Sequence, residues 1–382
     1  MRGSYAELLA DPSLDAVYIP LPNGLHAPWT LGAIKAGKHV LCEKPFTANA
    51  AQAREVAAAA EGTGLVVMEA FRYHPLAQRM AEITGGGALG RIERVEAAMC
   101  FPLPRLSDIR YDFSLAGGAL MDAGCYAVHA LRLLAPGEPT VMRARALTLG
   151  RDRRVDRAMT ARLSFGGGAT GELRASMWSA DLLRIRARAI GEHGALTVTN
   201  FVAPRLWSRF TVTVDGQRHR ERFGGEATYV HQLRAFAAAV RGEPANLTPP
   251  ADSVATMSVI DDIYVAAGLP LRGLPSGRVA LSAGAGAGAE RGQGAGVRAD
   301  VGIAGQGALG HEAERDRHDQ LRHRVRLHVG GARPSAPPAD YRRGAAGVLA
   351  ICRERGDDSG ARLAQGTSTT TASRVMTASK MR

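Results

Sequence analysis

Short apolar runs alternate with amphipathic stretches along residues 4–84. The apolar runs predict buried strands and the amphipathic stretches predict helices. We expect strands at residues 15–20, 39–45 and 65–70, and helices at residues 4–14, 26–37 and 51–64. Such alternation is typical of a doubly wound parallel α/β sheet, which binds its ligand at the carboxyl ends of its strands. The segments at those ends are residues 20–23, 43–45 and 69–72.

A glycine run at residues 85–87 marks a change of pattern. Beyond it, apolar and polar residues mostly alternate over longer segments, which predicts a half-buried, mainly antiparallel open sheet. Its strands are expected at residues 91–101, 141–150, 157–165, 169–178, 182–191 and 209–216, with helices at 118–134, 229–242 and 252–268. One face of such a sheet is left for solvent or a partner, so we expect a homo-oligomer formed through it.

The last part of the chain, residues 273–382, is rich in Ala, Gly and Arg, and Tyr341 is its one aromatic residue. It cannot easily bury enough apolar surface to fold, so we predict a disordered, low-complexity tail. It holds 17 Lys and Arg against 10 Asp and Glu, so seven of the twelve net positive charges lie there. Two alternatives stay open. Segment 318–328 could bind nucleic acid, although it lacks interleaved aromatic residues, and the tail could be read-through or out-of-frame sequence.

Several other classes of protein find no support. The four cysteines show no CxxC spacing, so buried free thiols are expected rather than a zinc site or disulfides. The histidines form no known metal-ligand pattern, and there is no GxSxG elbow. The first residues lack the apolar core of a signal peptide, and no apolar run is long enough to cross a bilayer. We therefore expect a cytoplasmic protein.

A polar stripe runs along the predicted helix at 118–134. Asp122, Tyr126 and His129 stand at positions i, i+4 and i+7 and project from one face. A solvated stripe on a surface helix would explain this pattern. The rest of the helix is largely apolar, however, and a polar stripe on a mostly buried helix usually faces a cleft.

Glu43, Lys44 and Pro45 form an EKP tripeptide at the end of a predicted strand. Alone, this lysine would be a solvated loop residue. The tripeptide stands with the turn PNGLH, with MEAFRYHP and with GGALMDAGCY, in that order. The series closes with TYVHQLRAFAAAVRGEP and DSVATMSVIDDIYVAAGLPLR. Together these segments resemble the glucose-fructose oxidoreductase, inositol dehydrogenase and MocA (Gfo/Idh/MocA) family over residues 4–272.

The resemblance implies an NAD(P)-dependent oxidoreductase that acts on a sugar, polyol or diol. It implies three parts: residues 1–84 as part of a Rossmann-type dinucleotide-binding domain, residues 85–272 as a substrate-binding and oligomerisation domain, and residues 273–382 as the tail. Lys44, Asp122 and Tyr126 match the family's catalytic positions. The GCY form resembles the dihydrodiol dehydrogenase branch and favours NADP over NAD. The implied cofactor-binding residues are Pro20, Asn23, His26, Glu43, Lys44, Pro45 and Arg72.

Alcohol oxidation requires that a proton leave the hydroxyl as hydride leaves the carbon. We expect Tyr126 to exchange this proton, with its pKa lowered from about 10 by the nearby Lys44 ammonium. Lys44 would polarise or hydrogen-bond the reacting oxygen. Asp122 would orient the sugar or the lysine.

One expected family feature has no match in this sequence. The family begins with a strand, a GxGxxG-like turn and a helix, and the glycine clusters at 62–64 and 85–87 do not follow a strand and open a helix. We therefore expect an amino-terminally truncated form whose first strand has an exposed apolar edge. The alternative is a catalytically inactive family member that acts only as an interaction or oligomerisation module.

Overall fold

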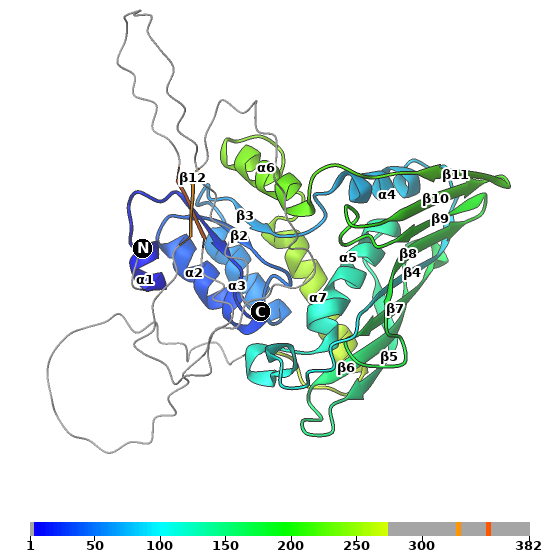
Figure 1. The fold of residues 1–382 in the computed structure, drawn as a ribbon, viewed down its shortest axis with the longest axis horizontal. Helices are drawn as coiled ribbons and strands as arrows, with labels where there is room; N and C mark the ends of the chain where they lie inside the picture. Colours follow the sequence, from blue (N-terminus) through cyan, green and yellow to red (C-terminus); the bar gives the residue numbers. More distant parts are fainter. Residues whose placement is uncertain (1–3, 274–325, 330–348, 353–382) are drawn as a thin grey trace, which may run out of the picture.

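The computed structural model describes residues 4–273, 326–329 and 349–352, which form two sheets with helices on and between them (Figure 1). The helices are α1 (Tyr5–Leu9), α2 (His26–Lys35), α3 (Ala50–Ala60), α4 (Pro75–Gly85), α5 (Cys125–Leu134), α6 (Thr228–Val240) and α7 (Pro250–Ala266). Helices α5 and α7 lie between the two sheets (Figure 1). Helix starts follow local chemistry: the Asn49 side chain accepts a hydrogen bond from Gln52 N at 2.9 Å, and Pro75 and Pro250 lie in first turns.

The amino-terminal sheet contains three parallel strands, in the order β1 (Ala16–Ile19), β2 (His39–Cys42) and β3 (Val67–Glu69). Ala16 is aligned with His39, and Val40 with Val67. Each strand is followed by a helix, which confirms the predicted parallel α/β architecture. The carboxyl ends of β1, β2 and β3 therefore share one edge of the sheet.

The other edge of β1 is paired, so the expectation of an exposed edge is wrong. Strand β13 (Leu349–Cys352) runs antiparallel to β1 and pairs in turn with β12 (Arg326–Val329). The rest of the predicted disordered tail, and segment 318–328 apart from its last residues, lie outside the described part of the chain.

The second sheet is large and open, as predicted. Its strand order is β11-β10-β9-β8-β4-β7-β6-β5, and the pairs are antiparallel except for β4 with β7. Helix α5 packs on one face, and the other face is bare in Figure 1. The strands are β4 (Ile92–Cys100), β5 (Thr140–Thr148), β6 (Asp156–Ser164), β7 (Thr170–Ser176), β8 (Arg184–Gly191), β9 (Gly194–Thr199), β10 (Arg209–Val214) and β11 (Gln217–Glu221).

The predicted helix at 118–134 has two parts. Leu120–Gly124 forms a π-helical turn, and α5 continues from Cys125. A π turn changes which backbone groups are paired, and such turns are frequent at functional sites. Asp122 and His129 are buried and Tyr126 is half-buried, so the solvated-stripe explanation is wrong.

A buried ion pair holds the start of this helix. Asp156 Oδ2 accepts a hydrogen bond from Leu120 N at 2.7 Å, and Asp156 Oδ1 lies 2.8 Å from Arg272 Nη2. Arg272 also donates through Nε to the Gly117 carbonyl at 3.0 Å. Both charged side chains are fully buried, so each depends on the other to offset the cost of its desolvation.

Three of the predicted free thiols are buried and unpaired, namely Cys42, Cys100 and Cys125, while Cys352 lies in β13. No helix in the described part of the chain has the length and apolar character needed to cross a membrane.

Gly118 lies against the Asp156–Arg272 ion pair at a φ of +148°, where an added Cβ would overlap Asp156 Oδ1. We predict that Gly118→Ala lowers the free energy of unfolding by about 3 kcal/mol or more, because it adds backbone strain to a steric clash. Gly37→Ala, at a φ of +70° with open space around it, should cost about 1 kcal/mol. Urea unfolding measures both, and equal losses would contradict the role given to Gly118.

Candidate active site

Lys44 follows β2, and its side chain is directed to the π-helical turn. Its Nζ donates to the Asp122 carbonyl oxygen at 3.3 Å and lies 4.8 Å from the centre of the Tyr126 ring. Burial disfavours its charge, but Cys125, Asp122 and Glu43 outweigh that effect and raise the pKa of Lys44. The ammonium is therefore charged although only 8% of the residue is exposed.

Asp122 is the second member of the site. Its Oδ2 accepts from Asn23 Nδ2 at 3.4 Å, and its Oδ1 lies 4.0 Å from Arg110 Nε without a hydrogen-bond partner among the described residues. Burial raises the pKa of Asp122 to about 6, against the opposing effects of Lys44 and Arg110. The site thus contains a buried acceptor oxygen that a ligand hydroxyl could satisfy.

Tyr126 packs against Lys44 and against Phe71, whose ring centre lies 4.9 Å away in an edge-to-face arrangement. Burial raises the pKa of Tyr126 well above its ordinary value, and Glu43, Cys125 and Asp122 add to the rise. Lys44 lies over the ring face. The phenol is therefore held in its protonated form, in contrast to the lowered pKa expected from the sequence.

Glu43 lies beside the lysine and binds a residue that the sequence analysis did not select. Tyr18 in β1 donates its hydroxyl hydrogen to Glu43 Oε1 at 2.6 Å, while Lys44 N donates to Glu43 Oε2 at 3.2 Å. Burial raises the pKa of Glu43. Tyr18 is half-buried, whereas the other residues of β1 are buried. A tyrosine, with its polar hydroxyl group, in an otherwise apolar strand is the sequence feature that could have identified it as a site residue.

His26 and Pro45 pack together behind the lysine. His26 is fully buried, with Nδ1 2.7 Å from the Pro45 carbonyl and Nε2 2.7 Å from the Leu21 carbonyl. Burial lowers the pKa of His26 to about 4. It ties the loop after β1 to the loop after β2, and half-buried Pro20 begins the first of these loops.

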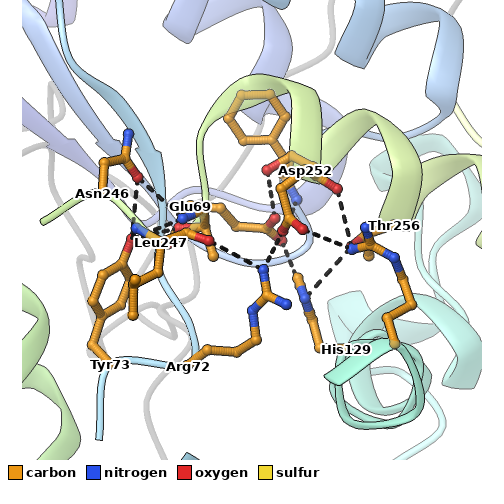
Figure 2. Close-up of polar contacts among 12 residues, drawn as sticks. Glu69, Arg72, Tyr73, His129, Asn246, Leu247, Asp252 and Thr256 are labelled. Carbon is orange, nitrogen blue, oxygen red and sulfur yellow. Dashed lines mark hydrogen bonds and ion pairs between the residues drawn. The ribbon is translucent and has the colours of Figure 1, made fainter. Parts of the chain in front are cut away.

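Arg72 is not brought to this cluster. Its guanidinium pairs with Asp252 in α7 and donates to the Leu247 carbonyl at 3.2 Å, as Figure 2 shows. Its backbone has a φ of +74°. The structure thus unites Asn23, Glu43, Lys44, Asp122 and Tyr126, but it directs Arg72 to α7.

The site fits the reacting end of a nicotinamide cofactor better than a metal. A buried cation, a protonated phenol and a carboxylate oxygen without a hydrogen-bond partner among the described residues lie at the carboxyl ends of β1 and β2, where such a sheet takes its ligand. Lys44, Asn23 and Pro45 would border the nicotinamide and its ribose. No glycine-rich turn that would hold the pyrophosphate follows β1, β2 or β3, and no group of three metal-ligating side chains occurs among the described residues.

The raised pKa of Asp122 makes its contribution to stability dependent on pH. The folded protein binds this proton more tightly than the unfolded chain, so the stabilisation is present below about pH 4 and is lost as the pH rises to about 6. We predict that the free energy of unfolding of Asp122→Asn, relative to that of wild type, rises by up to about 3 kcal/mol between pH 4 and pH 7. Urea unfolding at several pH values measures this gain. A gain no larger than that of Glu61→Gln, an exposed carboxyl control, would contradict the assignment.

Comparison with known proteins identifies the family. Residues 3–71 match a family model described as an oxidoreductase family with an NAD-binding Rossmann fold, and residues 77–197 match the GFO/IDH/MocA C-terminal domain. D-xylose 1-dehydrogenase (NADP(+)) 2 of Haloferax volcanii is 41% identical, covering 69% of this chain and 82% of that protein. Trans-1,2-dihydrobenzene-1,2-diol dehydrogenase of Xenopus laevis is 31% identical, covering 56% and 63%.

A solved structure shows the same fold. The structure of KijD10, a 3-ketoreductase from Actinomadura kijaniata, in complex with NADP and TDP-benzene superposes with a TM-score of 0.63. It is 30% identical in sequence, and the match covers 71% of this chain and 83% of that one. The chain belongs to the Gfo/Idh/MocA family of oxidoreductases, in which a Rossmann-fold NAD-binding domain precedes the C-terminal domain.

Proposed function

We propose that this protein is an NAD(P)-dependent oxidoreductase that interconverts a hydroxyl and a carbonyl group on a sugar, polyol or diol. The observation that supports this most is the contact of buried Lys44 with the Asp122 carbonyl and with the Tyr126 ring, beside an Asp122 Oδ1 that has no hydrogen-bond partner among the described residues. The alternative of an inactive interaction module is not favoured, because a buried lysine and a buried, incompletely paired aspartate are costly for a surface-only role.

The cofactor, when bound, supplies or accepts the hydride at the reacting carbon. Lys44 donates a hydrogen bond to the reacting oxygen and stabilises negative charge on it. Tyr126 is protonated at neutral pH, so it gives its phenol proton to the carbonyl oxygen during reduction. In the oxidation direction the phenol must first release its proton to water, and it then takes the proton of the substrate hydroxyl. Asp122 Oδ1 accepts a hydrogen bond from a neighbouring substrate hydroxyl and orients the ring.

A polyhydroxylated substrate fits the polar groups of the site. Asp122 Oδ1 offers an acceptor to a hydroxyl next to the reacting carbon, while Phe71 gives an apolar wall. The names of the relatives refer to xylose, a dihydrodiol and a keto group. The name of the Haloferax volcanii dehydrogenase includes NADP, and KijD10 was solved in complex with NADP, which supports NADP as the preferred cofactor here.

Removal of either catalytic group should stop turnover. We predict that Lys44→Met and Tyr126→Phe each lower kcat at least about 100-fold, because the reacting oxygen loses its hydrogen-bond donor or its proton donor. Lys35→Met, at an exposed position on α2, is the matched control and should be neutral. The assay follows NADPH absorbance with aldoses, aldonic lactones and vicinal diols. Near-normal activity in either variant, with folding verified by circular dichroism, would refute the assignment.

We also propose a homo-oligomer formed through the bare face of the large sheet. Ala97, Leu173 and Ala187 point to the covered face, so the alternate positions, including Arg174 and Arg186, point outward. Exposed apolar side chains lie in the segment that joins β7 to β8: Trp178, Leu182 and Leu183. Such a cluster at the border of an open face favours a protein partner.

The oligomer predicts a specific change in size. Leu183 is 64% exposed, and we expect Leu183→Glu to convert a dimer or larger species into monomer by placing charge in the interface. Val265→Glu, 66% exposed on α7, should leave the assembly intact. Light scattering coupled to size exclusion gives the mass. A monomeric wild type at tens of micromolar would exclude the oligomer.

A further inference from the structure

The elements that carry the site residues meet at one buried carboxylate, that of Glu69 at the end of β3. Its Oε1 accepts from Phe46 N at 3.1 Å and lies 3.2 Å from His129 Nε2. Its Oε2 accepts from Ser253 Oγ at 2.7 Å. The side chains of Glu69 and His129 are both 0% exposed. Phe46 is two residues after Lys44 and His129 is three residues after Tyr126, so a single oxygen links both halves of the site.

The hydrogen bonds beyond His129 have a fixed direction. Arg132 can only donate, and its Nη1 lies 2.7 Å from Thr256 Oγ1. The Thr256 hydroxyl hydrogen is then available to His129 Nδ1 at 3.5 Å, which leaves His129 Nε2–H to donate to Glu69. Figure 2 shows this chain between α5 and α7. It sets the tautomer of His129 and holds the ring in one orientation.

An aromatic contact connects the same groups. The Phe71 ring, two residues after Glu69, lies 4.9 Å from the Tyr126 ring and 5.1 Å from the His129 ring, measured between centres. A rotation of His129 away from Glu69 would therefore displace Phe71 and remove the wall behind Tyr126. Burial raises the pKa of Glu69, but the electrostatic effect and hydrogen bond of His129, together with the hydrogen bond from Ser253, outweigh burial and lower it, so the carboxylate is charged.

We propose that Glu69 and His129 are positioning residues that hold the Lys44 loop and the Tyr126 helix at their working separation. This role rests on the proposed function, in which Lys44 and Tyr126 act on one substrate oxygen. Neither residue contacts that oxygen. Their effect is to fix two backbones through one carboxylate, and misplacement of a catalytic group by about 1 Å costs up to about 100-fold in rate.

Matched variants of His129 separate positioning from packing. His129→Gln keeps a donor near the position of Nε2 and should retain kcat within about threefold. His129→Leu keeps bulk but removes the donor, and His129→Asn keeps an acceptor toward Thr256 but is too short for Glu69. Each of these two should lower kcat about 10- to 100-fold while the Kd for NADPH stays unchanged. Equal kcat values in the Gln, Leu and Asn variants would overturn the proposal.

A coupling measurement and a structural measurement complete the test. In a Tyr126→Phe background, His129→Asn should cause no further loss, because the positioned group is already absent. In crystal structures, the distance from Lys44 Nζ to the centre of the Tyr126 ring should increase from 4.8 Å to beyond about 6 Å in the Asn variant and not in the Gln variant. An unchanged distance in the Asn variant refutes the pair. The distance tests the positioning role of Glu69 and His129 even if the wild type lacks turnover. Lack of turnover would reject the proposed function and leave the positioning role to be decided by the distance.

Discussion

The buried ammonium of Lys44 is the constraint on which the site depends. A charge that is nearly excluded from water must be stabilised by nearby groups. Here these are the Asp122 carbonyl, the Tyr126 ring face and the Glu43 carboxylate. The π-helical turn presents its backbone carbonyl to the lysine, so helix geometry and lysine charge are linked. The same arrangement leaves Asp122 Oδ1 without a hydrogen-bond partner among the described residues, and that atom gives the site its capacity for a hydroxylated ligand.

The surrounding structure fixes the helix that carries Asp122 and Tyr126 at two points. The Asp156–Arg272 ion pair binds the Leu120 amide and the Gly117 carbonyl at its start, and the Glu69–His129 contact binds its second half. Both contacts bring together residues far apart in sequence, from the two sheets and from the segment after α7. A helix packed between two sheets holds in place the side chains that must act on one atom.

Much of the architecture could be predicted from the sequence because its signals are local. Periodicity located the parallel strands and most strands of the open sheet, and the motifs identified Lys44, Asp122 and Tyr126 as candidates. Charge pairing over long distances has no local signal. Arg72 follows β3 just as Lys44 follows β2, yet it pairs with Asp252, 180 residues later. The raised pKa of Tyr126 likewise depends on burial by distant segments, and the pairing of β13 with β1 came from a tail with weak strand signals.

The central claim is that Lys44 and Tyr126 act on the same substrate oxygen as one unit. The direct test is kcat/KM for wild type, Lys44→Met, Tyr126→Phe and the double variant, with one substrate and NADPH. Residues that act as a unit give strongly non-additive losses, so the double variant should lose no more than about threefold beyond the worse single variant. Losses that multiply across the two positions would contradict a shared site.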